Sequence, residues 1–186
     1  MDEVGRGPLA GPLAVGAVCI DKKRRRYLRG VKDSKKLTPL AREVWYAKFR
    51  NLEKMGIIRY KVAFVSEAMI DRNGLSSALM KAVGSCLRRL EVGPDTKIIL
   101  DGSLYAPASY TQQKTLVRGD EKRSVIAAAS IIAKVLRDRK MKCLGKRFPL
   151  YGFEKHKGYG TKAHYLALQI HGPSDFHRRS FLKGRR

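Results

Sequence analysis

The sequence has few cysteines and no long hydrophobic run. Cys19, Cys86 and Cys143 are far apart and have no CxxC spacing, so neither a disulfide framework nor a cysteine zinc site is indicated. The four histidines fit no compact ligand pattern either, and hydrogen-bonded or solvated histidines are expected. No apolar stretch approaches the ~20 residues that span a bilayer. The chain opens on acidic residues, glycines and prolines, unlike a secretory signal, and a cytoplasmic protein without a membrane span is predicted.

Acidic residues are also scarce. The chain has 16 Asp and Glu against 40 Lys and Arg, a formal net charge of +24. This charge predicts a polyanionic partner, because phosphate neutralisation and counterion release dominate affinity for nucleic acids. A ribosomal-type RNA-binding protein or a membrane-surface protein would carry similar charge. A length of 186 residues with 44% hydrophobic content suits one main domain with a small appendage.

Four of the few carboxylates lie beside glycines or at the ends of apolar runs. They are Asp2, Glu3, Asp101 and Asp120. Taken singly, each suits a polar terminus, a turn or a solvated loop. Taken together with their neighbours, they favour a site for Mg²⁺ or Mn²⁺, which prefer oxygen ligands and can be shared with substrate phosphates. A divalent-metal site in a nucleic-acid enzyme is therefore predicted. Neither a ribosomal-type RNA-binding protein nor a membrane-surface protein would explain these carboxylates.

Strands and helices alternate along the chain. Patterning predicts strands over 9–20, 57–65, 97–100 and 115–117, and helices over 38–56, 75–90, 124–144 and 161–171. Thr38 and Pro39 are typical of a helix start, and Leu40, Val44, Ala47 and Leu52 continue the first helix as its apolar positions. The order predicts an α/β fold with a mixed sheet and a small helical tail.

Several short sequence motifs occur in the order typical of the bacterial ribonuclease HII family, the type 2 ribonucleases H. They are Asp2-Glu3-Val4-Gly5-Arg6-Gly7-Pro8-Leu9, Asp33-Ser34-Lys35-Lys36-Leu37, Leu100-Asp101-Gly102, Gly119-Asp120, Ala128-Ala129-Ser130-Ile131-Ile132-Ala133-Lys134-Val135, Arg137-Asp138, His156-Lys157-Gly158-Tyr159 and His177-Arg178-Arg179-Ser180-Phe181. The chain resembles this family over nearly its full length. The resemblance implies a ribonuclease H-like mixed β-sheet flanked by helices in residues 1–145, and a small helical C-terminal segment, 146–186, that contributes substrate contacts.

The resemblance also implies an activity. It is hydrolysis of the RNA strand of RNA-DNA hybrids, and incision 5′ of ribonucleotides embedded in duplex DNA, leaving 3′-hydroxyl and 5′-phosphate ends. A monomer is expected. The metal-binding catalytic carboxylates are then Asp2, Glu3, Asp101 and Asp120, and they hold two Mg²⁺ or Mn²⁺ ions together with the scissile phosphate.

Further residues gain roles from the same resemblance. Gly5, Arg6 and Gly7 are similar to the element that reads the 2′-hydroxyl, the group that distinguishes RNA from DNA. Tyr159 is similar to the tyrosine that stacks on the neighbouring deoxyribose. The residues expected near substrate phosphates are Lys35, Lys36, Ser130 and Lys134. A solvated basic turn is the simpler interpretation of Lys35 and Lys36. Asp138 is a weaker candidate, as a partner of a metal or of a basic residue.

The N-terminus departs from the family pattern, because only Met1 precedes the Asp-Glu pair where family members carry several residues. Chain termini fray unless they are tied down, so an N-terminally truncated form with Asp2 and Glu3 displaced is one expectation. A noncatalytic nucleic-acid-binding relative is the corresponding alternative. A junction-resolving nuclease or an integrase of the same fold is another, but neither needs an element that reads the 2′-hydroxyl.

Overall fold

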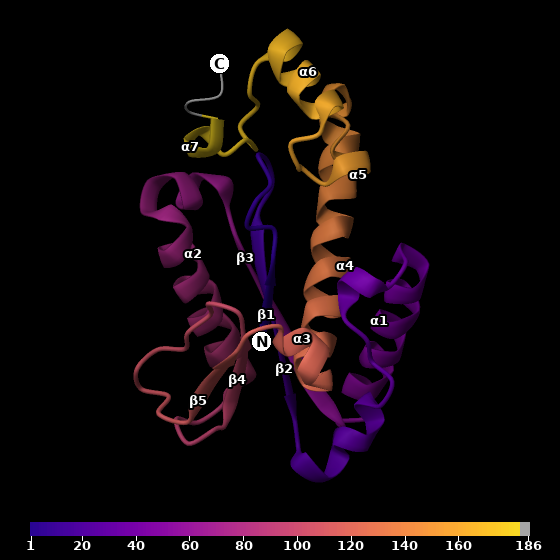
Figure 1. The fold of residues 1–186 in the computed structure, drawn as a ribbon, viewed down its shortest axis with the longest axis vertical. Helices are drawn as coiled ribbons and strands as arrows, with labels where there is room; N and C mark the ends of the chain where they lie inside the picture. The colour runs from indigo at the N-terminus through magenta and orange to yellow at the C-terminus, as the bar shows by residue number, and fades with distance from the viewer. Residues whose placement is uncertain (183–186) are drawn as a thin grey trace.

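A three-stranded antiparallel sheet lies at the centre of the molecule (Figure 1). β1 (Asp2–Val4) pairs with β2 (Leu13–Ile20), which pairs along its length with β3 (Ile58–Val65). Asp2 lies opposite Gly16. This structure is a computed structural model, and it describes residues 1–182.

Met1 joins this sheet to a second, parallel pair of strands. β4 (Ile98–Asp101) and β5 (Gln113–Leu116) form that pair. The Met1 amino group donates to the Ile99 carbonyl at 2.7 Å, and the Asp101 amide donates to the Met1 carbonyl at 3.0 Å. This is the hydrogen-bond pattern of neighbouring parallel strands, so the strands lie in the order β3-β2-β1-β4-β5. The predicted mixed sheet is confirmed.

Helices cover both faces of the antiparallel sheet (Figure 1). α2 (Glu67–Leu90) packs on one face, and α4 (Ser124–Arg147) packs on the other beside α1 (Pro39–Lys54). The alanine-rich α4 approaches the sheet closely at Gly16, where an added Cβ would lie 2.5 Å from the Ala129 carbonyl oxygen. This close approach brings the middle of α4 next to the position opposite Gly16, which is Asp2.

The first two long helices begin at side-chain caps. The Thr38 hydroxyl accepts from the Ala41 amide at 3.2 Å, as the predicted helix start requires. α2 begins at Glu67, before the predicted position 75, because Ser66 caps it and Gly74 interrupts it with φ 77° and ψ 166°. The predicted helix is therefore only the part of α2 that follows this break.

The apolar spacing of the first helix does not indicate its buried face, and the predicted start of the first long strand was wrong. Leu40 and Val44 are 75% and 64% exposed, and the buried face of α1 is formed by Tyr46, Phe49 and Leu52. Aromatic rings bury more apolar surface than Leu40 and Val44 do, so they face the core. The strand predicted from residue 9 begins only at Leu13.

The C-terminal segment packs at the end of α4 (Figure 1). It contains η3 (Pro149–Tyr151), α5 (Phe153–His156), α6 (Lys162–His171) and α7 (Arg179–Leu182). Ala10 joins an apolar cluster with this segment, and the Leu9 amide donates to the Gly158 carbonyl at 2.8 Å. These contacts draw residues 9–11 away from the sheet and explain the late start of β2.

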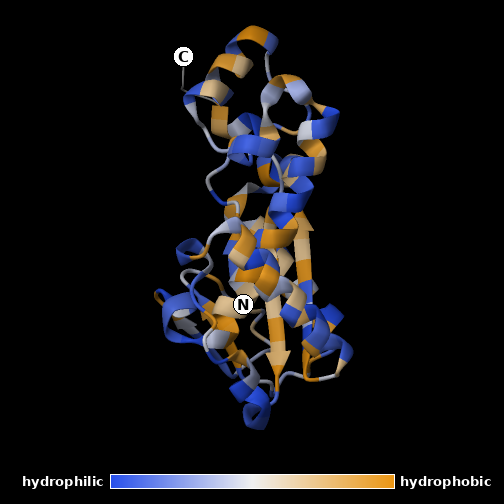
Figure 2. Cartoon of the chain, turned by 90° about the vertical axis from the view of Figure 1, so that its right-hand side faces the viewer, coloured by the Kyte–Doolittle hydropathy of each residue, from blue (hydrophilic) through white to orange (hydrophobic). Residues whose placement is uncertain are grey.

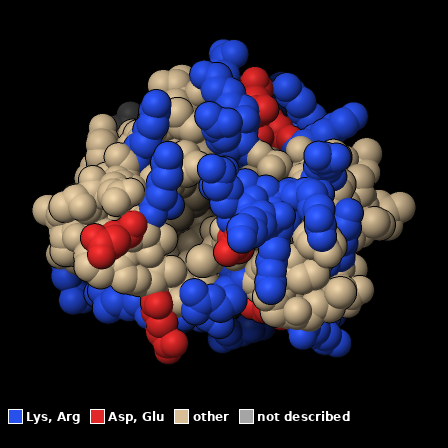
Figure 3. Space-filling model, turned by 90° about the horizontal axis from the view of Figure 1, so that it is seen from below, with Lys and Arg blue, Asp and Glu red and all other residues tan. Residues whose placement is uncertain are grey.

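Hydropathy and charge are unevenly distributed over the molecule. Hydrophobic residues are concentrated in the central strands and in parts of the helices, and the lower end is hydrophilic (Figure 2). That end carries η1 (Lys22–Leu28), in which only Leu28 is buried, and lysine and arginine side chains gather around it (Figure 3). None of the helices in residues 1–182 has the length and apolar character needed to cross a membrane.

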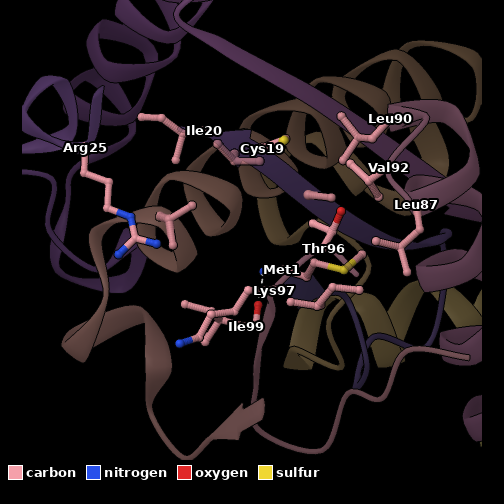
Figure 4. A pocket seen from close by; sticks show the side chains of 14 residues that line it. Met1, Cys19, Ile20, Arg25, Leu87, Leu90, Val92, Thr96, Lys97 and Ile99 are labelled. Atoms are coloured by element: carbon pink, nitrogen blue, oxygen red, sulfur yellow. Dashed lines mark hydrogen bonds between the residues drawn. The ribbon is translucent and has the colours of Figure 1, made fainter. Parts of the chain in front are cut away.

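A small apolar cavity of about 100 Å³ lies beside Met1 (Figure 4). Its walls include Cys19, Ile20, Leu87 and Leu90. Asp2, Asp101 and Asp120 are not part of its lining. The acidic site is therefore separate from this cavity.

Candidate metal centre

Three of the four acids singled out in the sequence meet at the junction of the two sheets. Asp2 comes from β1, Asp101 from the carboxyl end of β4, and Asp120 from the short helix α3 (Gly119–Lys122). Each offers one carboxylate oxygen, and these oxygens all lie within 4.8 Å of one another. We call these three residues the carboxylate cluster. Its donor set suits Mg²⁺ or Mn²⁺.

Backbone hydrogen bonds hold Asp2 and Asp101 of the carboxylate cluster in place. Asp2 lies in the β1-β2 ladder, next to a Met1 that is itself hydrogen-bonded to β4. The Asp101 carboxylate accepts a hydrogen bond from the Gly119 amide. An added Cβ at Gly119 would lie 2.6 Å from Cδ1 of Ile126 and 3.1 Å from Oδ1 of Asp101, so a side chain here would displace its neighbours. The displacement expected of a frayed first strand is not seen at Asp2.

Glu3 lies beside the cluster but not within it. One of its oxygens, Oε1, is 3.3 Å from Arg6 Nη1. Its other oxygen, Oε2, is buried and has no hydrogen-bond partner among the residues described, and the same holds for Asp120 Oδ2. Buried polar atoms are normally satisfied. Two buried carboxylate oxygens without hydrogen-bond donors are what a bound cation would satisfy, so these residues fit a divalent metal.

Burial and mutual repulsion make Asp2, Glu3 and Asp120 hard to ionise without a cation. Burial raises the pKa of Asp2 from 3.8 to about 7; the charges of Glu3 and Asp101 add to this, while a Ser130 hydrogen bond opposes it. Burial also raises the pKa of Glu3. The pKa of Asp120 is raised by burial and then by Asp101. A cation at the cluster would reverse these shifts.

The two lysines of the predicted phosphate-binding turn lie at different places. Lys35 Nζ is 3.6 Å from Asp120 Oδ2, and its side chain is 80% exposed. Lys36 Nζ instead pairs with Glu121 at 3.2 Å. Buried Asp33 shapes the turn, because its Oδ1 accepts from the Lys35 amide at 2.8 Å. Only Lys35 borders the carboxylate cluster.

The two predicted substrate-binding residues of α4, Ser130 and Lys134, also have different surroundings. Ser130 is buried, and its hydroxyl lies 2.8 Å from that of Ser34. Lys134 Nζ donates to Asp138 Oδ1 at 2.8 Å. Asp138 is therefore the partner of a basic residue and not a member of the carboxylate cluster. Sequence reasoning assigned no role to Ser34, although it lies in one of the family motifs.

The residues predicted to read the sugars lie around buried arginines. Gly5 has φ +90°, and Arg6 donates to the Ser103 hydroxyl at 2.7 Å. Tyr159 is 41% exposed, and the guanidinium of Arg137 lies 6.0 Å from the centre of its ring. Arg178 donates to the carbonyl of Gly5 at 2.7 Å. Neither arginine was assigned a role from the sequence, because Arg178 opens a basic run that suggests a solvated surface and Arg137 lies in a motif from which only Asp138 was considered.

Comparison with known proteins shows which family this chain belongs to. The family model for ribonuclease HII matches residues 1–183. The chain belongs to the ribonuclease HII family. A ribonuclease HII from Caldicellulosiruptor bescii is 45% identical over 183 residues, which are 98% of this chain and 85% of that protein. The structure of a PCNA:ribonuclease HII complex from Archaeoglobus fulgidus aligns with a TM-score of 0.76 at 28% identity, covering 98% of this chain and 92% of that one.

Membership of this family establishes the broad class of activity. The protein is a hydrolase, an endoribonuclease of the ribonuclease H type that acts on nucleic acid, and its sheet and helices form a ribonuclease H fold. The structure of Bst-RNase HIII in complex with Mn²⁺ shares the fold, with a TM-score of 0.66 at 22% identity over 91% of this chain and 68% of that one. Ribonucleases H depend on divalent metals, and the carboxylate cluster agrees with this.

Proposed function

We propose that this protein hydrolyses the RNA strand of RNA-DNA hybrids and incises duplex DNA on the 5′ side of embedded ribonucleotides. The observation that carries the proposal is the position of Asp2, a member of the carboxylate cluster that lies three residues before Gly5 in Gly5-Arg6-Gly7, in a chain of the ribonuclease HII family. We call these three residues the GRG loop. A cluster that can hold a metal beside a loop that can read a sugar suits cleavage next to a ribose.

The proposed metal ligands are Asp2, Asp101 and Asp120, with Glu3 joining them through its buried Oε2. Two Mg²⁺ or Mn²⁺ ions, when bound, would activate water and stabilise charge on the attacking and leaving oxygens, giving 3′-hydroxyl and 5′-phosphate ends. Lys35, beside Asp120, supplies positive charge next to the scissile phosphate. Ser130, beside Asp2, orients that carboxylate through its hydroxyl.

The remaining proposed contacts select and hold the substrate. The backbone of Gly5, Arg6 and Gly7 recognises the 2′-hydroxyl, since a loop with two glycines lets a sugar approach the peptide. The half-exposed ring of Tyr159 stacks on the next deoxyribose. Lys36 and Lys134 contact backbone phosphates more loosely, because each is already paired with an acid. Residues 146–186 contribute Tyr159, and the protein acts as a monomer in the cytoplasm.

The test is cleavage of a labelled DNA duplex that carries one ribonucleotide, beside an all-DNA duplex, with Mg²⁺, Mn²⁺ or chelator. Metal-dependent cutting 5′ of the ribonucleotide is expected, and Asp101→Asn should abolish it. Asp95→Asn changes an exposed acid outside the cluster and should cut like the unmodified chain. Tight binding without cutting would instead identify a noncatalytic relative. Cutting of the all-DNA duplex would favour a junction-type nuclease.

A further inference from the structure

The GRG loop and Tyr159 are about 150 residues apart in the sequence, and two buried arginines connect them. The first arginine, Arg178, lies against the GRG loop. The Arg178 side chain is fully buried. Its Nη2 donates to the Gly5 carbonyl at 2.7 Å and its Nη1 to the Arg6 carbonyl at 2.9 Å. Its Nε and Nη2 both donate to the Gly11 carbonyl, at 3.0 and 2.7 Å. All three nitrogens of the guanidinium are therefore used to hold the backbone around the GRG loop.

A second fully buried arginine links the loop to the Tyr159 turn. Arg137 Nη1 donates to the Lys157 carbonyl at 3.1 Å, and its Nε donates to the Pro12 carbonyl at 2.9 Å. The same guanidinium lies against Gly5, where an added Cβ would be 2.3 Å from Arg137 Nε. Arg137 thus touches both elements at once.

A chain of buried histidines completes the link from Arg178 to Tyr159. The Ser174 amide donates to His177 Nδ1 at 2.9 Å, so the proton of the neutral His177 ring is on Nε2. His177 Nε2 lies 3.0 Å from His164 Nε2, and His164 Nδ1 lies 2.9 Å from the Tyr159 carbonyl. Each hydrogen bond therefore has only one possible direction: His177 donates to His164, and His164 donates to Tyr159.

We propose that Arg178 and His177, adjacent in the chain, are positioning residues that hold the GRG loop and Tyr159 at a fixed separation. This inference rests on the proposed function. If the loop reads a ribose and Tyr159 stacks on the next sugar, their separation must match one nucleotide step. It follows that Arg178 and His177 set the preference for an RNA-to-DNA junction over continuous RNA. A misplacement of about 1 Å can lower a rate by about 10²-fold.

The test compares kcat and KM for two substrates, a duplex with a single ribonucleotide and a continuous RNA-DNA hybrid. Arg178→Lys keeps the charge but lacks the planar fork that reaches three carbonyls. We expect it to lower kcat/KM for the single ribonucleotide about 10-fold more than for the hybrid, with the Mn²⁺ midpoint unchanged, since the metal ligands lie on β1, β4 and α3. Arg179→Lys is the matched control, because Arg179 is the exposed neighbour, and its ratio should not change.

A second variant covers the case in which Arg178→Lys does not fold. His177→Asn keeps an acceptor for the Ser174 amide but removes the donor to His164 and the ring that packs against Tyr151 and Phe153. It leaves the hydrogen bonds of Arg178 in place, so it should shift the ratio of the two kcat/KM values by a smaller factor. Equal losses on both substrates in a folded variant would overturn the inference, since general destabilisation produces that result. If the unmodified chain cuts neither substrate, the proposed function itself fails. If the unmodified chain cuts both substrates, and both variants keep its ratio of kcat/KM for the single ribonucleotide to kcat/KM for the hybrid, only the inference fails.

Discussion

Replacing Asp2 with asparagine is expected to stabilise the metal-free protein at neutral and alkaline pH. Burial holds the pKa of Asp2 at about 7 in the folded state, against 3.8 ordinarily. The folded state therefore binds the proton more tightly than the unfolded state does, and stability falls as the pH rises from about 4 to about 7. A pKa difference of about 3 corresponds to about 4 kcal/mol. Asparagine carries no charge, so it removes this penalty, although its altered hydrogen bonding offsets part of the gain. The free energy of unfolding is therefore expected to rise by about 2 to 4 kcal/mol at pH 8.

The assay is urea unfolding in EDTA between pH 5 and 8.5, for the unmodified chain, Asp2→Asn and the control Asp95→Asn. The advantage of Asp2→Asn should shrink as the pH is lowered, because Asp2 is then protonated in the unmodified chain as well. Added Mn²⁺ should stabilise the unmodified chain and have a much smaller effect on Asp2→Asn, since a ligand of the folded state alone stabilises it by mass action. An Asp2→Asn variant less stable than the unmodified chain in EDTA at pH 8 would refute the reasoning.

Two further predictions concern a buried histidine and an exposed lysine. Burial, and then the neighbouring His164, lower the pKa of His177 from 6.5 to about 4. The unfolded state then binds more protons between these values, so stability should fall by up to about 3 kcal/mol as the pH is lowered from 6.5 to 4. Urea midpoints of His177→Asn should vary less over that range, and an unchanged slope would contradict this. Lys35→Gln should weaken duplex binding and reduce its salt slope by about 1, as measured by titration at several salt concentrations, whereas an unchanged slope would exclude a phosphate contact.

Local sequence patterns were sufficient where the structure depends on neighbouring residues. Thr38 and Pro39 predicted a helix start that the Thr38 hydroxyl indeed caps. The apolar run before Asp101 predicted a strand that ends at this acid. Each of these features is decided within a few residues, by a cap or by the end of an apolar run.

Local sequence patterns failed where contacts between segments far apart in the sequence decide the structure. Leu9 continues an apolar run, yet its amide bonds to Gly158 in the C-terminal segment, so the strand begins later. Leu40 has helical spacing, but larger aromatic residues on another face of α1 take the core. The family motifs brought the three aspartates together, but they did not reveal that Glu3 pairs with Arg6 outside the cluster. Nor did they reveal that Arg178, within a basic run, is fully buried.

The position of the carboxylate cluster connects metal binding to the assembly of the fold. Asp2 belongs to the antiparallel sheet, Asp101 to the parallel pair and Asp120 to α3, and within residues 1–182 the strands of the two sheets are joined through the backbone of Met1. The three oxygens come within 4.8 Å of one another only when both sheets and the loop to α3 are in place. Without a cation, their repulsion opposes this junction. A cation bound to all three would therefore stabilise the contact between β1 and β4, because the ligand geometry that it needs exists only when this junction has formed.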